Sequence, residues 1–194
     1  MQSDTPPGGI PGVPEDAGGA NEAAFRAALA EAAPAVRRFL VTLSGDPQAA
    51  EDASQDVLLK AWRAREAFDG RSRLTTWLFR IARNHWLDLV RRRACMPGSE
   101  PLDRHEPAVA DTGPCPAERR ETAEAVRRAL ARLPAEQCEA LALRESGTLT
   151  FEQAGEVLGV PAATVKSRVR YALLKLAEHL ASLAPNAASP QETR

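Results

Sequence analysis

The sequence predicts an all-α protein, with two small helical domains joined by a flexible linker and a helix-turn-helix in the second. Three observations support this fold class. Apolar residues recur at helical spacings of three and four, and no segment shows the period of two typical of a half-buried strand. Two long blocks are rich in Ala, Leu, Arg and Glu, which favour helix. A proline-rich segment separates these blocks, as expected for an extended linker.

Composition also divides the chain into five parts. Residues 1–20 hold four Pro and five Gly with few apolar side chains, so we expect a disordered tail there. The first helical domain spans 21–93, and the second spans 118–183. The linker between them, 94–117, contains five prolines and has a net acidic balance. Residues 184–194 offer little for packing and form a second disordered tail.

Breaks in the pattern predict four helices in the first domain. Pro34 interrupts the first of them, because proline lacks a backbone N–H and clashes inside a helix. The segment SGDP ends the second helix, and either Asp46 or Pro47 opens the third. The predicted helices cover 22–33, 35–44, Asp46 or Pro47 to about Arg65, and about Leu74 to Arg93.

Charge is distributed unevenly along the chain. The formal net charge is −1, which by itself argues against a nucleic-acid partner. Residues 1–56, however, carry nine acids and three bases, whereas residues 71–93 carry seven Arg and a single acid. A second stretch, 160–175, has four basic residues and no acid. Two cationic segments among acidic ones indicate a polyanionic partner.

Several classes of protein are excluded by what the sequence lacks. No apolar run approaches the roughly 20 residues of a membrane span, so we expect no membrane insertion. The N-terminus has neither the basic start nor the apolar core of a secretory signal. Three cysteines are too few and too scattered for a disulfide framework, which fits a reducing compartment. We therefore expect a soluble cytoplasmic protein.

An enzyme is not expected either. The sequence has no glycine-rich phosphate loop, no H-E-x-x-H motif and no spacing that suggests a Ser/His/Asp triad. We assign no catalytic residue, metal or cofactor. Cys95, His105 and Cys115 are evenly spaced in the linker, and binding of a metal or redox sensing is the alternative for them. Zinc-ligand pairs are normally two to four residues apart, and these residues are about ten apart, which argues against a metal site. Cys138 lies in a helical segment and is expected to be an ordinary side chain.

The predicted helix from Leu74 to Arg93 combines a broad apolar face with a narrow polar stripe. The apolar face comprises Leu74, Leu78, Phe79, Ile81, Ala82, His85, Trp86, Leu89 and Val90. The stripe comprises Trp77, Arg80, Asn84, Asp88 and Arg91, flanked by Arg83. Arg binds phosphates, Asn pairs with base edges, and aromatic rings stack on unstacked bases. A core helix with a solvated outer face is the alternative, but Trp77 on the polar side favours nucleic-acid reading.

The predicted third helix carries an acidic stripe instead. Asp52, Gln55, Asp56 and Leu59 lie at i, i+3, i+4 and i+7, with little basic charge nearby. Asp near a helix start also suits the helix dipole, so a purely structural role is one interpretation. The other is a docking face for a basic protein surface.

The second domain contains a helix-turn-helix signal. Thr150 and Gln153 form a capping box, Gly159 ends the helix that begins at Phe151, and Pro161 begins the next. We expect Val165, Val169, Ala172, Leu173 and Leu176 to form the buried stripe of this second helix. The outward side chains are Ala163, Thr164, Ser167, Arg170 and Tyr171, with Lys166 and Arg168 on the flanks. Small, polar and basic residues there suit entry into the major groove, although an ordinary helical hairpin is possible.

Taken together, four segments resemble a two-domain bacterial sigma factor of the extracytoplasmic-function (ECF) group of the sigma-70 family. They are AEDASQDVLLKAW, RSRLTTWLFRIARNHWLDLVRRR, LARLPAEQCEALALRE and LTFEQAGEVLGVPAATVKSRVRYALLKLAEHL. Their order, their spacing and the proline-rich linker all match, and the resemblance covers roughly residues 22–183. It implies an alternative sigma factor that directs promoter-specific transcription initiation.

The resemblance also implies a role for each group of residues. The third helix, through Asp52, Gln55, Asp56 and Leu59, would dock on core RNA polymerase. The loop 68–75 and the fourth helix, through Arg73, Trp77, Arg80, Arg83 and Asn84, would melt and hold the −10 element of promoter DNA. Thr164, Lys166, Ser167, Arg168, Arg170 and Tyr171 would contact the −35 element. An anti-sigma factor is implied as a further partner, and the linker would thread through the polymerase.

One alternative to a sigma factor is a freestanding helix-turn-helix regulator that binds DNA through 150–176 and dimerises through 22–93. The two hypotheses differ in what 71–93 does, because a dimerisation helix does not need seven Arg beside Trp77 and Asn84.

Overall fold

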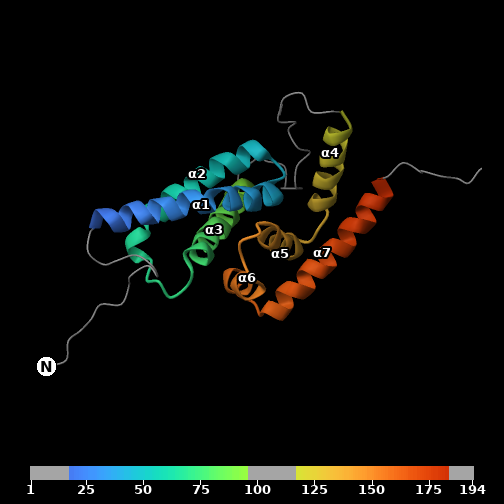
Figure 1. Cartoon of the computed structure of the whole chain (residues 1–194). Coiled ribbons are helices and arrows are strands. Elements are labelled where there is room, and N and C mark those ends of the chain that lie inside the picture. Colours follow the sequence, from blue (N-terminus) through green and yellow to red (C-terminus); the bar gives the residue numbers. More distant parts are fainter. Residues whose placement is uncertain (1–17, 96–116, 184–194) are drawn as a thin grey trace, which may run out of the picture.

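The computed structural model describes residues 18–95 and 117–183, and every regular element in these ranges is helical (Figure 1). The first domain contains α1 (Gly18–Ser44), α2 (Pro47–Arg63), the 3₁₀ turn η1 (Arg65–Ala67) and α3 (Leu74–Ala94). The second contains α4 (Ala117–Ala131), α5 (Ala135–Glu145), α6 (Phe151–Leu158) and α7 (Ala162–Leu183). The all-α fold class is confirmed. Residues 1–17 of the expected tail (1–20), residues 96–116 of the expected linker (94–117) and the whole of the second tail (184–194) lie outside the described residues.

The expected break at Pro34 is wrong, because α1 continues through it as one helix of 27 residues. The helix also starts at Gly18, so it includes the last three residues of the expected tail. An interior proline normally costs about 3 kcal/mol. Here its ring faces solvent, while Phe25, Leu29 and Phe39 are buried on the opposite face on both sides of it. Burying those side chains offsets the cost of one missing backbone hydrogen bond.

The turn from α1 to α2 follows the sequence prediction. Gly45 adopts a positive φ of 71°, which suits glycine because it has no Cβ. The Asp46 carboxylate then caps α2 by accepting hydrogen bonds from the backbone N–H groups of Gln48 (2.8 Å) and Ala49 (3.2 Å). Pro47 occupies the first helical position, where no N–H is needed. This tight turn makes α1 and α2 antiparallel neighbours.

An aromatic cluster at one end of the first domain joins four segments. Phe25 of α1 and Phe68 of the loop before α3 are buried, and both rings contact Trp77, with centroids 6.2 Å and 5.3 Å away. Trp62 of α2 lies 6.3 Å from Phe25. Such pairs contribute roughly 0.5–1.5 kcal/mol each beyond the area they bury. The cluster therefore fixes the loop 68–73 at the start of α3.

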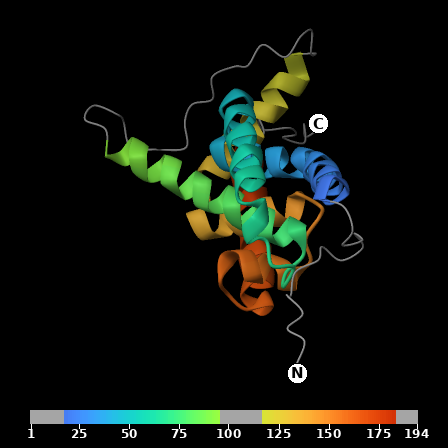
Figure 2. The same cartoon turned by 90° about the vertical axis from the view of Figure 1, so that its left-hand side faces the viewer.

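In the second domain α5 is the central helix. It packs against α7 and α6 on one side and against α1 of the first domain on the other. Its residues Cys138, Ala140, Ala142 and Leu143 have no exposed surface. Figure 1 shows α5 and α6 lying between the first domain and the long helix α7, and Figure 2 gives the view turned by 90°, from the side of the first domain. The two domains thus pack directly on each other through α1 with α5 and α3 with α6, beyond any connection by the linker.

Candidate nucleic-acid and protein interface

The acidic stripe on α2 faces solvent. Asp52, Gln55, Asp56 and Leu59 are all exposed, and the apolar Leu59 side chain is 47% exposed. The opposite face of α2 is buried in the first domain through Ala50, Ala53, Ser54, Val57 and Ala61. An exposed leucine among carboxylates and an amide has a form suited to a protein surface that offers an apolar pocket and basic groups.

Behind this stripe, a buried histidine connects α2 to α3. The His85 side chain is buried, and its Nδ1 lies 2.6 Å from the Lys60 ammonium, while its Nε2 lies 3.7 Å from a carboxylate oxygen of Asp56. Burial lowers the pKa of His85 below its usual value, and the Lys60 charge lowers it further against an opposing effect of Asp56. A neutral imidazole can accept a hydrogen bond from Lys60 at Nδ1 and direct its Nε2–H toward Asp56.

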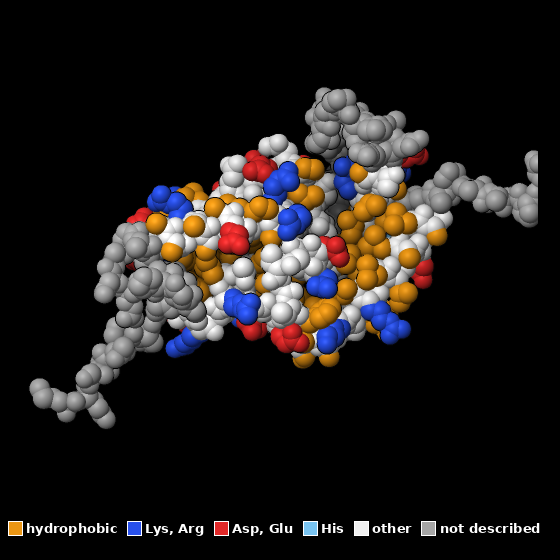
Figure 3. All heavy atoms as spheres, in the orientation of Figure 1, with side chains coloured by type: hydrophobic (Ala, Val, Ile, Leu, Met, Phe, Trp, Pro, Cys, Tyr) orange, Lys and Arg blue, Asp and Glu red, His pale blue; other side chains and the backbone are white. Residues whose placement is uncertain are grey.

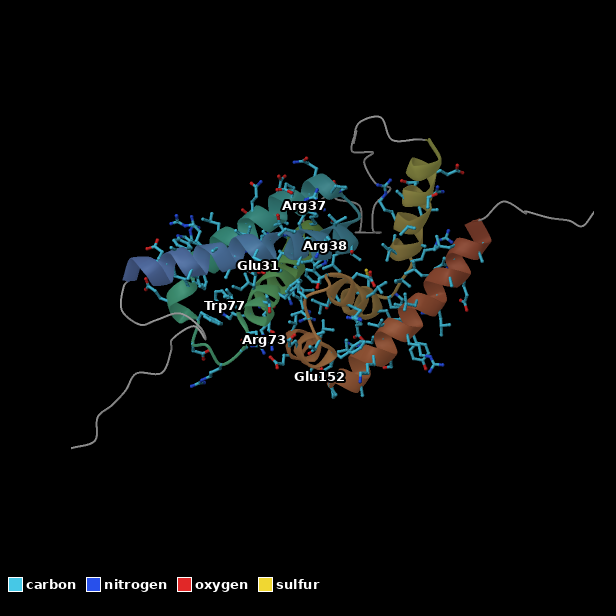
Figure 4. All side chains as sticks on the ribbon, in the orientation of Figure 1. Glu31, Arg37, Arg38, Arg73, Trp77 and Glu152 are labelled. Carbon is cyan, nitrogen blue, oxygen red and sulfur yellow. The ribbon has the colours of Figure 1, made fainter. Side chains whose placement is uncertain are left out.

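Trp77 was expected to lie open on the polar stripe of α3, and this expectation is wrong. Its ring is half-buried in the aromatic cluster, where it packs on Phe25 and Phe68. Loop 68–73 turns back over the start of α3, so this position is covered even though it lies on the polar side of the helix. Arg73 and Asn84 are exposed, as expected for side chains that contact a ligand. Figure 4 labels Arg73 and Trp77 near the start of α3.

Arg80 and Arg83 are not free cations on an open stripe either. The Arg83 Nε donates to Glu139 of α5 at 2.7 Å, and the Arg80 guanidinium lies 3.6 Å from the Glu156 carboxylate of α6. Arg80 Nε also donates to the Glu156 carbonyl at 3.4 Å. The acids come from the second domain, so a helical-wheel argument within α3 could not reveal these partners.

The helix-turn-helix has the predicted local geometry. The Thr150 N–H donates to the Gln153 side chain at 2.8 Å, and the Gln153 N–H donates to the Thr150 hydroxyl at 3.3 Å. Gly159 ends α6 with a φ of 71°. Gly155 lies against the turn, since a Cβ at this position would be 2.6 Å from the Val160 carbonyl oxygen. The second helix begins at Ala162, with the Pro161 carbonyl accepting from Thr164 and Val165.

The predicted reading residues occupy one side of α7. Lys166, Ser167, Arg170 and Tyr171 are exposed, and Thr164 is half-buried. Arg168 is more constrained, because its guanidinium pairs with Glu136 of α5. The Glu152 carboxyl, close to this surface and labelled in Figure 4, has its pKa lowered by hydrogen bonds from its own backbone N–H and the Thr150 hydroxyl. A basic surface with a hydroxyl and an aromatic ring at the start of a helix suits DNA.

The buried stripe predicted for α7 is right for Val165, Val169 and Ala172, and wrong for Leu173, which is 52% exposed. Leu176 is partly buried, and Leu174 is exposed beside Leu173. Figure 3 shows the hydrophobic side chains that gather on this side of the molecule. Leu173 follows the buried Ala172 by one residue, about 100° further round the helix, and so lies outside the face of α7 that α4, α5 and α6 cover.

Some residues of the interface were not singled out from the sequence. Arg37 and Arg38 are adjacent in α1 and diverge, as Figure 4 shows: Arg37 pairs with Glu51 of α2, and Arg38 donates to the carbonyl of Ser146, which caps the end of α5, at 2.7 Å. Two adjacent arginines on the polar side of an amphipathic helix are common, so the sequence alone does not indicate that Arg38 contacts the second domain. Glu139 lies among apolar residues of α5, and a buried acid in that position is a signal that a cation must face it.

The described residues contain no group of three His, Cys, Asp or Glu side chains arranged to hold a metal ion. His105 and Cys115 lie outside the described ranges, whereas Cys95 is exposed. In 18–95 and 117–183, no helix has the length and hydropathy that crossing a bilayer requires.

Family comparisons match both domains. The Sigma-70 region 2 model matches residues 29–95, and the Sigma-70 region 4 model matches residues 129–178. The ECF RNA polymerase sigma factor RpoE of Cereibacter sphaeroides is 34% identical over 164 residues, which cover 82% of this chain and 88% of that protein. The ECF sigma factor SigM of Mycobacterium tuberculosis is 37% identical over 134 residues, covering 69% and 65% of the two chains.

Solved structures agree with this match. The Bartonella quintana sigma factor RpoE, in complex with the anti-sigma factor NepR, has a TM-score of 0.63 and 30% identity, covering 84% of this chain and 99% of that one. CnrH, in complex with the cytosolic domain of CnrY, has the same fold, with a TM-score of 0.57 at 23% identity. The region 2 match contains the α2 stripe and the α3 arginines, and the region 4 match contains the helix-turn-helix. The chain belongs to the ECF group of the sigma-70 family and is an alternative sigma factor that directs transcription initiation.

Proposed function

We propose that three surfaces of the described chain each bind a different partner in transcription initiation. The exposed stripe of α2, comprising Asp52, Gln55, Asp56 and Leu59, docks on core RNA polymerase. Helix α3 and the loop before it bind the −10 element, and the N-terminal half of α7 binds the −35 element. One observation carries this proposal. The α2 stripe is exposed, the chain also has two separate basic helices, α3 and α7, and these elements fall in the segments that match the region 2 and region 4 models.

At the −10 element, Asn84 and Arg73 are the side chains best placed to contact DNA first. Both are exposed, and an amide can form two hydrogen bonds with a base edge. Trp77 has a structural role instead of contacting DNA directly, because its packing with Phe25 and Phe68 supports the loop that carries Arg73. Arg80 and Arg83 bind phosphates once their acidic partners move away. Capturing an unstacked base offsets part of the few kcal/mol that unstacking costs.

At the −35 element, Lys166, Ser167, Arg170 and Tyr171 present an exposed surface to the major groove. Thr164 is half-buried near the helix start, and Arg168 is held by Glu136, so its contribution is to phosphate contacts at the flank. Lysine and arginine contacts with phosphates supply affinity that does not depend on sequence and that falls steeply with salt. No step of this mechanism requires covalent chemistry by the chain, so we propose that it is not an enzyme.

A protein inhibitor is the further partner that we propose. The solved relative with 30% identity is bound to an anti-sigma factor. In this chain, Leu173 and Leu174 expose apolar surface on α7, and a groove of about 340 Å³ lies between the end of α1 and α4, lined by residues such as Val41, Val126 and Leu130. Such surfaces suit an amphipathic helix. We place the protein in the cytoplasm, where core polymerase is found.

The experiment that tests the proposed function is promoter opening by the full chain with and without core polymerase. Unpaired thymines around position −10 should react with permanganate only when both proteins are present, and the two should co-migrate in gel filtration. Tight binding to duplex operator DNA by the chain alone, together with failure to co-migrate with core, would instead support the freestanding regulator. Arg73→Ala and Asn84→Ala should reduce thymine reactivity while leaving co-migration unchanged.

A further inference from the structure

A buried histidine of α3 lies directly beneath the acidic stripe of α2. The His85 side chain is 5% exposed, and each of its ring nitrogens faces a different charged residue of α2. Its Nδ1 lies 2.6 Å from the Lys60 Nζ, and its Nε2 lies 3.7 Å from an Asp56 carboxylate oxygen. The Asp56 side chain is 64% exposed. The histidine therefore connects the interior of the first domain to a carboxylate of the proposed docking surface.

The spacing of Asp56 and Lys60 would favour a direct ion pair between them. An acid and a base four residues later lie on the same face of a helix and attract each other. In the structure, the Lys60 ammonium is instead within hydrogen-bond distance of His85 Nδ1. Nδ1 accepts this hydrogen bond only when it carries no proton, so the ring hydrogen is on Nε2, the nitrogen nearer Asp56. The neutral ring thus binds the lysine that would otherwise pair with the carboxylate.

The Nε2 atom of His85 is a second, independent observation. It is buried and has no hydrogen-bond partner among the described residues, since the Asp56 oxygen at 3.7 Å is too distant. A buried donor without a partner is costly, and so is a carboxylate that loses its water when a partner protein covers it. A movement of about 1 Å by the exposed Asp56 side chain would satisfy both groups.

We propose that His85 is a positioning residue for polymerase docking: its neutral ring holds Lys60 away from Asp56 and supplies the donor that Asp56 needs once core polymerase covers it. This inference rests on the proposed function, because it takes the α2 stripe as the docking surface. It adds that the strength of docking depends on the protonation state of one buried histidine.

Protonation of the ring reverses both effects. An imidazolium has no free lone pair, so Nδ1 no longer accepts from Lys60, and the two cations repel each other. The released ammonium can then pair with Asp56, and the imidazolium can pair with it through Nε2–H. Either pairing neutralises a negative charge that a basic partner surface would otherwise meet. Docking is therefore strongest with a neutral ring and weakens as the pH falls.

The charged groups that face the ring come from two helices. Lys60 and Asp56 belong to α2, whereas Asp88 and Arg92 belong to α3, the helix that carries the histidine. Burial lowers the pKa of His85, and the two cations lower it further, while the two acids oppose this shift. The ring is therefore neutral at pH 7.5 and takes up a proton below about pH 6.5.

The test measures the dissociation constant of the labelled full chain for core polymerase at pH 7.5 and at pH 5.5, by fluorescence anisotropy. His85→Gln keeps an amide donor and acceptor but cannot take up a proton in this range. His179→Gln makes the same change near the end of α7, in the second domain, and serves as the matched control. Circular dichroism at both pH values shows whether each chain is folded. The same core preparation is used throughout, so the pH dependence of polymerase itself cancels between chains.

Wild type and the His179→Gln control should both bind core more weakly at pH 5.5 than at pH 7.5. The ratio of their two dissociation constants should be about threefold larger than the ratio for His85→Gln. Lys60→Met keeps the histidine and changes an exposed residue, so it decides the question if His85→Gln folds poorly; its ratio should also be smaller than that of wild type. Equal ratios for wild type and His85→Gln, or for wild type and Lys60→Met, would overturn the proposal.

Asp56→Asn separates this inference from the proposed function. If the α2 stripe docks on core, this variant binds core more weakly than wild type at pH 7.5. If it does so while His85→Gln and wild type have equal ratios, the stripe docks on polymerase and the histidine does not position it. If Asp56→Asn binds core as tightly as wild type, the docking surface itself is wrong, and the role of His85 is refuted with it.

Discussion

Leu59 offers the sharpest test of the proposed polymerase-docking surface. It is the exposed apolar side chain of the α2 stripe, and Leu59→Ala removes it without disturbing the core, because the buried face of α2 lies opposite. Alanine also favours helix at least as well as leucine, so α2 should stay intact. The variant is therefore expected to fold normally and to bind core polymerase more weakly.

The size of the effect follows from the exposed surface. Fully burying a leucine contributes roughly 1.5–3 kcal/mol. Leu59 is 47% exposed in the free chain, so about half of that gain is available when a partner covers it. Truncation to alanine should cost ~1 kcal/mol of binding free energy, which corresponds to roughly a fivefold increase in the dissociation constant.

The assay is a titration of labelled chain with core polymerase, read by fluorescence anisotropy. Leu59→Met serves as the control, because it keeps the volume and apolar character of the side chain and should stay within about twofold of wild type. Thermal unfolding of both variants checks that the fold is unchanged. If Leu59→Ala binds core as tightly as wild type, α2 does not dock through this stripe and the reasoning from its exposure fails.

Three further predictions concern the remaining surfaces. Lys166→Ala and Arg170→Ala should each make the plot of log affinity for −35 DNA against log salt concentration less steep by about 0.9, because each removes one phosphate contact. The affinity is measured in the presence of core polymerase from low to physiological salt. Unchanged slopes would show that neither side chain contacts a phosphate. Gly155→Ala should lower the free energy of unfolding by ~1–3 kcal/mol in urea melts, because its Cβ would lie 2.6 Å from the Val160 carbonyl oxygen, whereas an unchanged melt would contradict the close approach. Because the pKa of His85 is lowered on folding, the unfolded chain takes up a proton that the native state resists, and stability is lost as the pH falls below about 6.5. His85→Asn should reduce the drop in melting temperature between pH 7.5 and 5.5, and an equal drop in both proteins would refute this assignment.

Much of the fold was predictable because local chemistry determines it. The Asp46 cap with Pro47, the Thr150 capping box and the Gly159 terminus each use a few neighbouring residues, and all appear where the sequence places them. Pro34 shows the limit of such rules. The local rule accounts for the hydrogen bond that proline lacks. It does not account for the burial of apolar side chains on the other face of α1, which outweighs the cost of that missing bond.

The candidate site likewise has one part that the sequence predicted and another that it did not. Exposure of the α2 stripe and of most of the α7 reading face was predictable, because one helix period decides which side chains face outward. The environments of Trp77, Arg80 and Arg83 were not, because each depends on a segment distant in sequence: the loop at Phe68 or the acids Glu156 and Glu139. Periodicity identifies the face on which a residue lies and carries no information about which other element covers that face.

Transcription by purified core polymerase on fragmented genomic DNA from the source organism, with and without the full chain, tests the central claim most directly. Sequencing the 5′ ends of the transcripts locates every start site. The account predicts a set of new starts that appear only when the chain is added, that share sequence elements near −10 and −35, and that weaken with Asn84→Ala and Arg170→Ala. Start sites that are the same with and without the chain would contradict its assignment as a promoter-selecting subunit of RNA polymerase.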